Sequence, residues 1–146
     1  MSIKYEVYTD GADRHKGKFH IGGWCSYIKS TEDTRTFSGL VRNSKKFDVT
    51  NNRMELVAII EAVRMCLEDS NITLYSDSEY SVNVLSGNEH AKVNLDLIKD
   101  YNEVIKKKHL HDTFQHIDRE ENTYADGIIR YMLDHNEEAK SHGALK

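Results

Sequence analysis

Residues 50–56 read TNNRMEL, and this stretch opens the element that decides the fold. From Asn52 to about Glu68 the residues are good helix formers, with the charged ones grouped on one side, so a mostly buried helix is predicted. Strand-like segments stand before and after it. A strand, a long helix and another strand predict a parallel crossover within one sheet. The chain is therefore expected to be an α/β protein.

The other predicted elements build a mixed sheet around this helix. Alternating apolar residues predict three antiparallel strands before it, the first ending at Asp10 and Gly11 and followed by a polar loop at 11–20. Two later strands are expected parallel to the first. The predicted strands cover residues 3–9, 21–30, 34–42, 72–76 and 112–117, and the predicted further helices cover 78–87, 94–108 and 122–138.

Length and composition exclude several classes of protein. The 146 residues fit one domain, expected at 1–138, followed by a flexible tail at 139–146. The net charge of −4 argues against a protein held on nucleic acid by bulk charge alone. The longest apolar runs are too short to cross a membrane, and the N-terminal residues lack the pattern of a secretory signal. Together with two unpaired cysteines, this predicts a cytoplasmic protein.

Glu55 is the first candidate for chemistry. It shares a helical stripe with Ala58, Ile59 and Ala62, so its carboxylate is expected to face the core. A buried carboxylate must take up a proton, pair with a cation or bind a metal. The alternative is an ordinary acid at the rim of the first helical turn, where the helix dipole favours negative charge.

Three further acids are predicted to lie near Glu55. Asp10 and Asp77 each follow a strand, and the carboxyl ends of parallel strands share the edge where α/β sheets bind ligands. Asp126 stands in the first turn of the last predicted helix. Taken alone, each acid is better explained as a turn, cap or helix-start residue than as a ligand. Topology makes a cluster of four acids plausible, but their spacing does not prove it.

Five motifs in order resemble those of the type 1 ribonuclease H family, over residues 3 to about 135. They are YTDGA at 8–12, GGW at 22–24, TNNRMEL at 50–56, LYSDSEY at 74–80 and HIDREENTYAD at 116–126. The resemblance implies a ribonuclease H-like fold, a five-stranded mixed sheet with helices on both faces. It also implies that Asp10, Glu55, Asp77 and Asp126 are catalytic metal ligands.

The resemblance implies an endoribonuclease that hydrolyses the RNA strand of RNA/DNA hybrids and leaves 3′-hydroxyl and 5′-phosphate ends. Two Mg²⁺ ions, with Mn²⁺ as a substitute, would bind the four acids, because divalent ions stabilise both the attacking and the leaving oxygen. Asp10 would bridge the ions, Asp126 would complete the site that activates water, and Glu55 and Asp77 would hold the ion on the leaving-group side.

The resemblance also assigns residues around the acids. His116, ten residues before Asp126, would handle protons or assist product release, although a structural histidine at a strand end is the plain alternative. Contacts to the minor groove and to phosphate are implied for Gly11, Ala12, Thr50, Asn51, Asn52, Ser78 and Glu79. At Glu79 the family's amide is replaced by a carboxylate, which repels phosphate.

A larger departure lies between the two middle helices. Many relatives carry a basic, tryptophan-rich insertion there, whereas this chain has only GNEHAKV at 87–93. Weak, salt-sensitive substrate binding is therefore predicted, aided by Lys16, Lys18 or Arg42.

Two other functions remain open at this point: a nuclease of the same fold that cuts a DNA junction, and a non-catalytic module that binds hybrids. A monomer is expected, with no membrane association and no protein partner. A binding module would gain nothing from four clustered acids near phosphates, which favours the enzyme.

Overall fold

The computed structural model describes residues 3–141, with side chains described up to residue 136. Within this range the chain forms one five-stranded sheet, four α-helices and a short 3-10 helix. The strands are β1 (Lys4–Lys16), β2 (Phe19–Lys29), β3 (Thr34–Arg42), β4 (Asn71–Ser76) and β5 (His111–His116). The helices are α1 (Asn51–Met65), α2 (Glu79–Ser86), α3 (Leu95–Lys108), η1 (Arg119–Glu121) and α4 (Thr123–Ser141).

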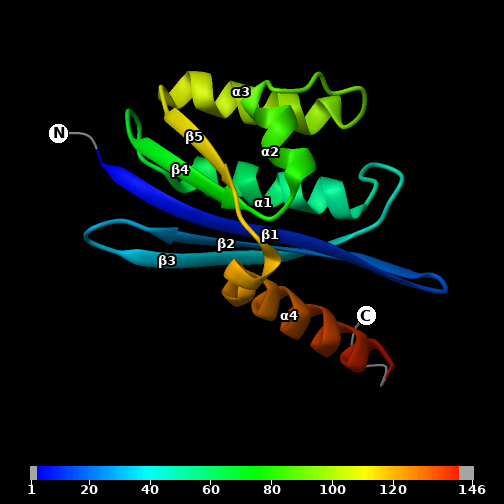
Figure 1. Cartoon of the computed structure of the whole chain (residues 1–146). Helices are drawn as coiled ribbons and strands as arrows, with labels where there is room; N and C mark the ends of the chain where they lie inside the picture. The colour runs from blue at the N-terminus through cyan, green and yellow to red at the C-terminus, as the bar shows by residue number, and fades with distance from the viewer. Residues whose placement is uncertain (1–2, 142–146) are drawn as a thin grey trace.

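The sheet has the order β3-β2-β1-β4-β5. The first three strands pair antiparallel, and β4 pairs parallel with both β1 and β5. Helices α1, α2 and α3 lie on one face and α4 lies alone on the other (Figure 1). The predicted mixed sheet with helices on both faces is confirmed. No helix among the described residues is long and apolar enough to cross a bilayer.

Two separate apolar clusters hold the layers together. The larger lies between the sheet and helices α1 to α3 and includes Val7, Leu56, Ile59, Leu74 and Tyr101. The smaller lies under α4 and consists of Ile21, Cys25, Ala125, Ile129 and Leu133. The sheet is therefore buried on both sides, by unequal amounts of apolar surface.

The predicted end of the first strand was wrong. β1 does not stop at Asp10 but continues to Lys16, and it stays paired with β2 as far as the pair Lys16 and Phe19. The turn between them uses Gly17, whose φ of 59° suits glycine. The 11–20 segment looked like a loop because its side chains are polar on both faces. Its strand conformation comes from pairing across the hairpin, which periodicity does not show.

Helix boundaries differ less. α1 ends at Met65, three residues before the predicted end. Thr50 caps its start by accepting a hydrogen bond at 3.1 Å from the backbone N–H of Arg53. α4 continues to Ser141, so residues 139–141 of the expected tail are helical, and the remainder of that tail lies outside the described residues.

Candidate active site

The candidate site lies where β4 ends against β1. The parallel pairing of these strands finishes at Thr9 and Ser76, so Asp10 and Asp77 are the next residue on each strand. Asp10 pairs with Cys25 of β2, which packs in the cluster under α4. Beyond the end of β4, the sheet edge is open to side chains from both helical layers.

Glu55 reaches this edge because α1 packs unusually close to β1. A Cβ atom placed on Gly11 would lie only 2.3 Å from the carbonyl carbon of Met54 and 2.4 Å from the backbone nitrogen of Glu55. Real Cβ atoms do not tolerate such distances, so the absence of a side chain at Gly11 sets the depth of the helix. The glycine after Asp10 therefore serves close approach rather than a turn.

Three of the four predicted acids come together. Asp10, Glu55 and Asp77 each offer a carboxylate oxygen within 4.8 Å of the others. Burial, followed by the charge of Asp77, raises the pKa of Asp10 to about 7. Burial and the charges of Asp10 and Asp77 raise the pKa of Glu55 well above its usual range. The Oε1 atom of Glu55 is buried without a hydrogen-bond partner among the described residues.

These raised pKa values predict how the stability of the metal-free protein depends on pH. The folded chain keeps a proton on Asp10 up to about pH 7, whereas an unfolded aspartate releases it near pH 4. Because the folded state binds more protons in that interval, the free energy of unfolding should fall as pH rises from about 4 to about 7, by a few kcal/mol.

Urea titrations in EDTA across this pH interval measure the effect. Asp10→Asn, which cannot titrate at this position, should flatten the profile. A free energy of unfolding that rises over the same interval, with the wild-type residue in place, would contradict the burial of Asp10 beside the other acids.

Asp126 is not a member of the close group of three. It lies in the first turn of α4, and its Oδ2 accepts a hydrogen bond at 2.9 Å from Nη2 of Arg130. Its negative charge nevertheless contributes to the raised pKa of Asp10. The α4 layer thus brings the fourth acid to the border of the cluster, partly neutralised by a neighbour on its own helix.

Asn122 is a site residue that sequence reasoning missed. Its side chain is buried, and Nδ2 donates to the backbone oxygen of Thr9 at 2.8 Å and to Oδ2 of Asp77 at 3.3 Å. It thus ties the start of α4 to both strands that carry acids. In the sequence an asparagine before a helix is typical of a cap, so no local signal distinguished it.

His116 is the last residue of β5 and lies next to the acids. Its Nε2 is 3.2 Å from the backbone oxygen of Asp77, and the side chain is exposed. An imidazole in this position contacts both solvent and the segment that carries an acid of the cluster.

The residues expected to contact substrate surround the cluster at the starts of two helices. Asn51 and Asn52 are exposed in the first turn of α1, and Oδ1 of Asn51 accepts from the backbone N–H of Asp13 at 2.8 Å. Ser78 caps α2, accepting at 3.1 Å from the N–H of Ser81, and Glu79 is exposed beside it. Gly11 and Ala12 directly follow Asp10 on β1. Thr50 is the cap of α1 and directly precedes Asn51.

Comparison with known proteins now identifies the family. The RNase H family model matches residues 3–130. The chain belongs to the ribonuclease H family. The ribonuclease H of Prosthecochloris aestuarii is 32% identical over 93% of this chain and 99% of its own length. That of Rickettsia massiliae is 33% identical over 75% of this chain and 68% of its own length.

Solved structures share the fold. The N-terminal RNase H domain of a Mycobacterium tuberculosis protein superposes with a TM-score of 0.76 at 20% identity, over 95% of this chain and 99% of that one. LC11-RNase H1, solved in complex with an RNA/DNA hybrid, gives 0.73 at 23% identity, over 87% of this chain and 94% of its own. The ribonuclease H-like architecture predicted from the motifs is confirmed.

The acids of this ribonuclease H chain suit a divalent cation. Their ligand atoms are all carboxylate oxygens, the hard donors that Mg²⁺ and Mn²⁺ prefer. Three lie close together, and one oxygen of Glu55 has no partner although it is buried. A cation would supply the missing partner and offset the burial and the repulsion that raise the pKa values of Asp10 and Glu55.

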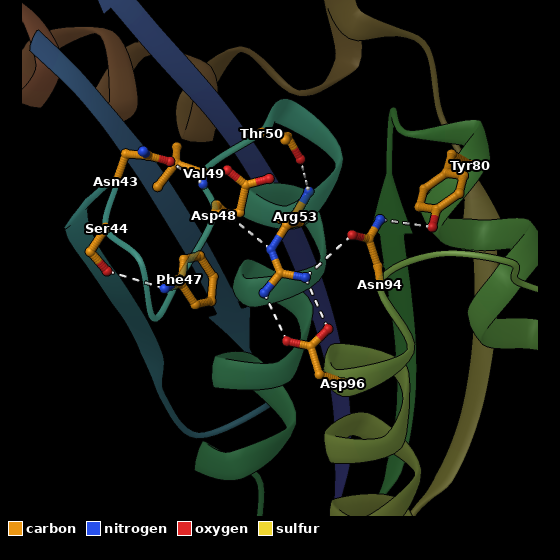
Figure 2. A network of polar contacts seen from close by, with 10 residues as sticks. All are labelled: Asn43, Ser44, Phe47, Asp48, Val49, Thr50, Arg53, Tyr80, Asn94 and Asp96. Atoms are coloured by element: carbon orange, nitrogen blue, oxygen red, sulfur yellow. Dashed lines mark hydrogen bonds and ion pairs between the residues drawn. The ribbon is translucent and has the colours of Figure 1, made fainter. Parts of the chain in front are cut away.

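A polar network fixes the start of α1, which carries Glu55 (Figure 2). The buried guanidinium of Arg53 donates to both oxygens of Asp96, at 2.9 and 2.8 Å, and to the backbone oxygen of Asp48 at 2.7 Å. It also stacks over Phe47, 4.5 Å from the ring centre. One side chain therefore joins α1, the segment before it and the start of α3.

The network extends to the helix that follows Asp77. Nη1 of Arg53 lies 3.3 Å from Oδ1 of Asn94, whose Nδ2 donates at 3.0 Å to the hydroxyl of Tyr80 in α2. Asn94 has a left-handed backbone with φ of 60°, and its side chain bridges Arg53 and Tyr80. The helices next to Glu55 and Asp77 are thereby linked.

Arg53→Met should lower the free energy of unfolding by about 2 kcal/mol, because it leaves the carbonyl of Asp48 without its donor and breaks the ion pair with Asp96, whose exposed carboxylate can turn to solvent. Chemical denaturation measures this change. Arg35→Met is the matched control, since Arg35 pairs with Asp33 on the exposed surface, and should cost less than about 0.5 kcal/mol. Equal effects of the two variants would refute the structural role of the network.

Proposed function

We propose that this chain is an endoribonuclease that hydrolyses the RNA strand of RNA/DNA hybrids and leaves 3′-hydroxyl and 5′-phosphate ends. The observation that carries the proposal is the group of three carboxylates at the end of β4, in a member of the ribonuclease H family. In a protein that only bound nucleic acid, negative charge facing the phosphates would lower the affinity.

Asp10, Glu55, Asp77 and Asp126 are proposed to hold two Mg²⁺ ions, for which Mn²⁺ could substitute. Bound ions of this kind activate water and stabilise charge on the phosphate and on the leaving oxygen. The chain supplies the pre-arranged acids: burial of Asp10 and Glu55 and their nearness to Asp77 make their negative charge unfavourable without a cation, so bound cations would displace the protons and offset that charge. Asn122 orients Asp77 through its hydrogen bond.

Recognition of the RNA strand is proposed for the exposed start of α1. The amides of Asn51 and Asn52 can donate to and accept from 2′-hydroxyls, which DNA lacks. Backbone groups of Gly11 and Ala12 would contact the same groove, and Thr50 would help to seat a DNA phosphate. Ser78 would add a hydroxyl contact, whereas the carboxylate of Glu79 would repel phosphate and shift that contact.

His116 is proposed to move protons or to assist product release. Its ring lies at the backbone of Asp77 and is open to solvent, so it can exchange protons with water beside the cluster. We also propose that the protein is a cytoplasmic monomer. Cys25 and Cys66 are both buried free thiols, which suits a reducing compartment.

The test offers labelled RNA/DNA hybrid, duplex RNA, duplex DNA and a four-way DNA junction to the protein in Mg²⁺ or EDTA. Cleavage of the RNA strand of the hybrid alone, dependent on Mg²⁺, is expected. Cleavage of the junction instead, or binding of the hybrid without any cleavage, would overturn the proposal. End analysis of the products checks the 3′-hydroxyl and 5′-phosphate.

A further inference from the structure

Besides the lysine run 106–108 at the end of α3, positive charge is concentrated in two short segments of an otherwise acidic chain. Residues 15–20 and 42–46 contain no acid and carry five cations: Lys16, Lys18, Arg42, Lys45 and Lys46. Because the whole chain carries −4, all other residues together carry −9. A phosphate backbone is therefore repelled by most of this protein and attracted to these segments.

The two segments lie side by side in the structure. Arg42, at the end of β3, pairs in register with Ile21, next to the hairpin between β1 and β2. The backbone N–H of Asn43 donates at 3.0 Å to the oxygen of His20. We call the five cations on this hairpin and the adjoining turn the basic arm. All five side chains belong to exposed residues.

The cations of the basic arm are free, but the frame beneath them is ordered. In the described part of the chain none of the five side chains forms an ion pair, whereas nearby Arg14 pairs with Asp134 at 2.5 Å. His15 and His20 stack with ring centres 4.3 Å apart, and His20 lies 3.0 Å from Asp13. The backbone of the hairpin is therefore paired, and its lysines stand on an ordered frame.

The basic arm extends from the strand that carries the acids. Lys16 lies six positions after Asp10 on β1, a span of roughly 20 Å at about 3.3 Å per residue. The hydrogen bond from Asp13 to Asn51 fixes the base of the arm against the start of α1. Figure 1 shows the hairpin projecting past the α1 layer on the side away from β5.

The opposite side of the α1 start offers no such charge. There Arg53 contacts the connection between α2 and α3, whose residues 87–94 contain one acid, Glu89, and one lysine, Lys92. Near the start of α1, most of the positive charge that could bind a duplex therefore lies on the side of the β1–β2 hairpin.

We infer that the basic arm binds the phosphate backbone of the duplex on one side of the cleaved bond. It would thereby supply the electrostatic attraction that the short α2–α3 connection does not supply. This inference rests on the proposed function and goes beyond it, because it assigns a second contact region, roughly 20 Å from the acids along β1. The arm contributes to substrate binding and takes no part in the chemical step.

The first experiment measures how hybrid binding depends on salt. Fluorescence anisotropy with a labelled hybrid is recorded in EDTA in the Asp10→Asn background. Lys16→Gln/Lys18→Gln should reduce the slope of log affinity against log salt by roughly one unit for each lysine that contacts a phosphate. Lys106→Gln/Lys107→Gln removes the same charge from the far end of α3 and should leave the slope unchanged.

Kinetics of otherwise wild-type protein then separate binding from chemistry. The double variant in the arm should raise KM by about tenfold or more at moderate salt with kcat unchanged, as expected for lost uniform binding. If KM and the salt slope are unchanged in the double variant while the wild-type protein cleaves normally, the arm does not bind the duplex and the proposed function still stands. If the wild-type protein neither binds nor cleaves hybrid, the proposed function and the arm fall together.

A tethered probe locates the arm on the duplex. Both native thiols are buried, and burial raises the pKa of each to about 12. Lys18→Cys therefore offers one reactive thiol for an iron chelate that cuts nearby nucleic acid by hydroxyl radicals. Cuts confined to one side of the bond that the enzyme cleaves are expected. Cuts on both sides, or none above background, would refute this placement.

Discussion

Asp10→Asn is expected to reduce hybrid hydrolysis roughly a thousandfold or more while making the metal-free protein more stable to heat. The activity falls because an amide is a poor ligand for a divalent cation at the centre of the cluster. The stability rises because the substitution removes a buried charge that lies near Glu55 and Asp77. At pH 8 the thermal midpoint should rise by about 5 °C.

Single-turnover cleavage in Mg²⁺ and calorimetry in EDTA measure the two effects. Mg²⁺ should raise the thermal midpoint of the wild-type protein, by the mass action of a ligand that binds only the folded state, and raise that of Asp10→Asn much less. Asp134→Asn makes the same chemical change at an exposed side chain and should affect neither property appreciably. A lower midpoint for Asp10→Asn would refute the repulsion.

Gly11→Ala is expected to destabilise the protein by about 3 kcal/mol or more and to abolish cleavage. The new methyl group would meet the backbone of Met54 and Glu55 at 2.3 to 2.5 Å. Backbone atoms cannot turn aside as a flexible side chain can, so α1 must move away from β1. Because Glu55 belongs to the displaced turn, the acid cluster opens as well.

Gly127→Ala provides the matched control. Gly127 lies in α4 and a Cβ atom there would have nothing within 4 Å. Alanine favours the helix over glycine, so this variant should be more stable by about 0.5 to 1 kcal/mol. Urea denaturation of both variants tests the pair. If the two variants had similar free energies of unfolding, the close packing of α1 on β1 would not depend on glycine at position 11.

The arrangement of strands and helices was predictable because it depends on the spacing of apolar residues and on the order of the elements along the chain. The apolar stripe that follows TNNRMEL and the strand after it required a parallel crossover, and the sheet has one. The hairpin at 11–20 was not predictable in this way. Polar residues such as Asp13 and His20 form strand there through contacts with each other across the turn.

The candidate site was predictable in part for a similar reason. Asp10 and Asp77 follow strand ends, and topology alone brings such residues together. The motifs, rather than the spacing, pointed to Asp126, whose carboxylate stands apart from the other three and pairs with Arg130. The roles of Asn122 and Arg53 were not predicted. Asn122 acts through a hydrogen bond to Thr9 and Arg53 through hydrogen bonds to Asp96, and such long-range contacts leave no periodic pattern in the sequence.

The isolation of α4 on its own face has a consequence for protein synthesis. Residues up to β5 supply every strand of the sheet and all members of the larger apolar cluster, and they include Asp10, Glu55 and Asp77. Asn122 and Asp126 come later and dock through the smaller cluster. A growing polypeptide would thus carry most of its catalytic groups while still inert, and would gain activity only after α4 had left the ribosome.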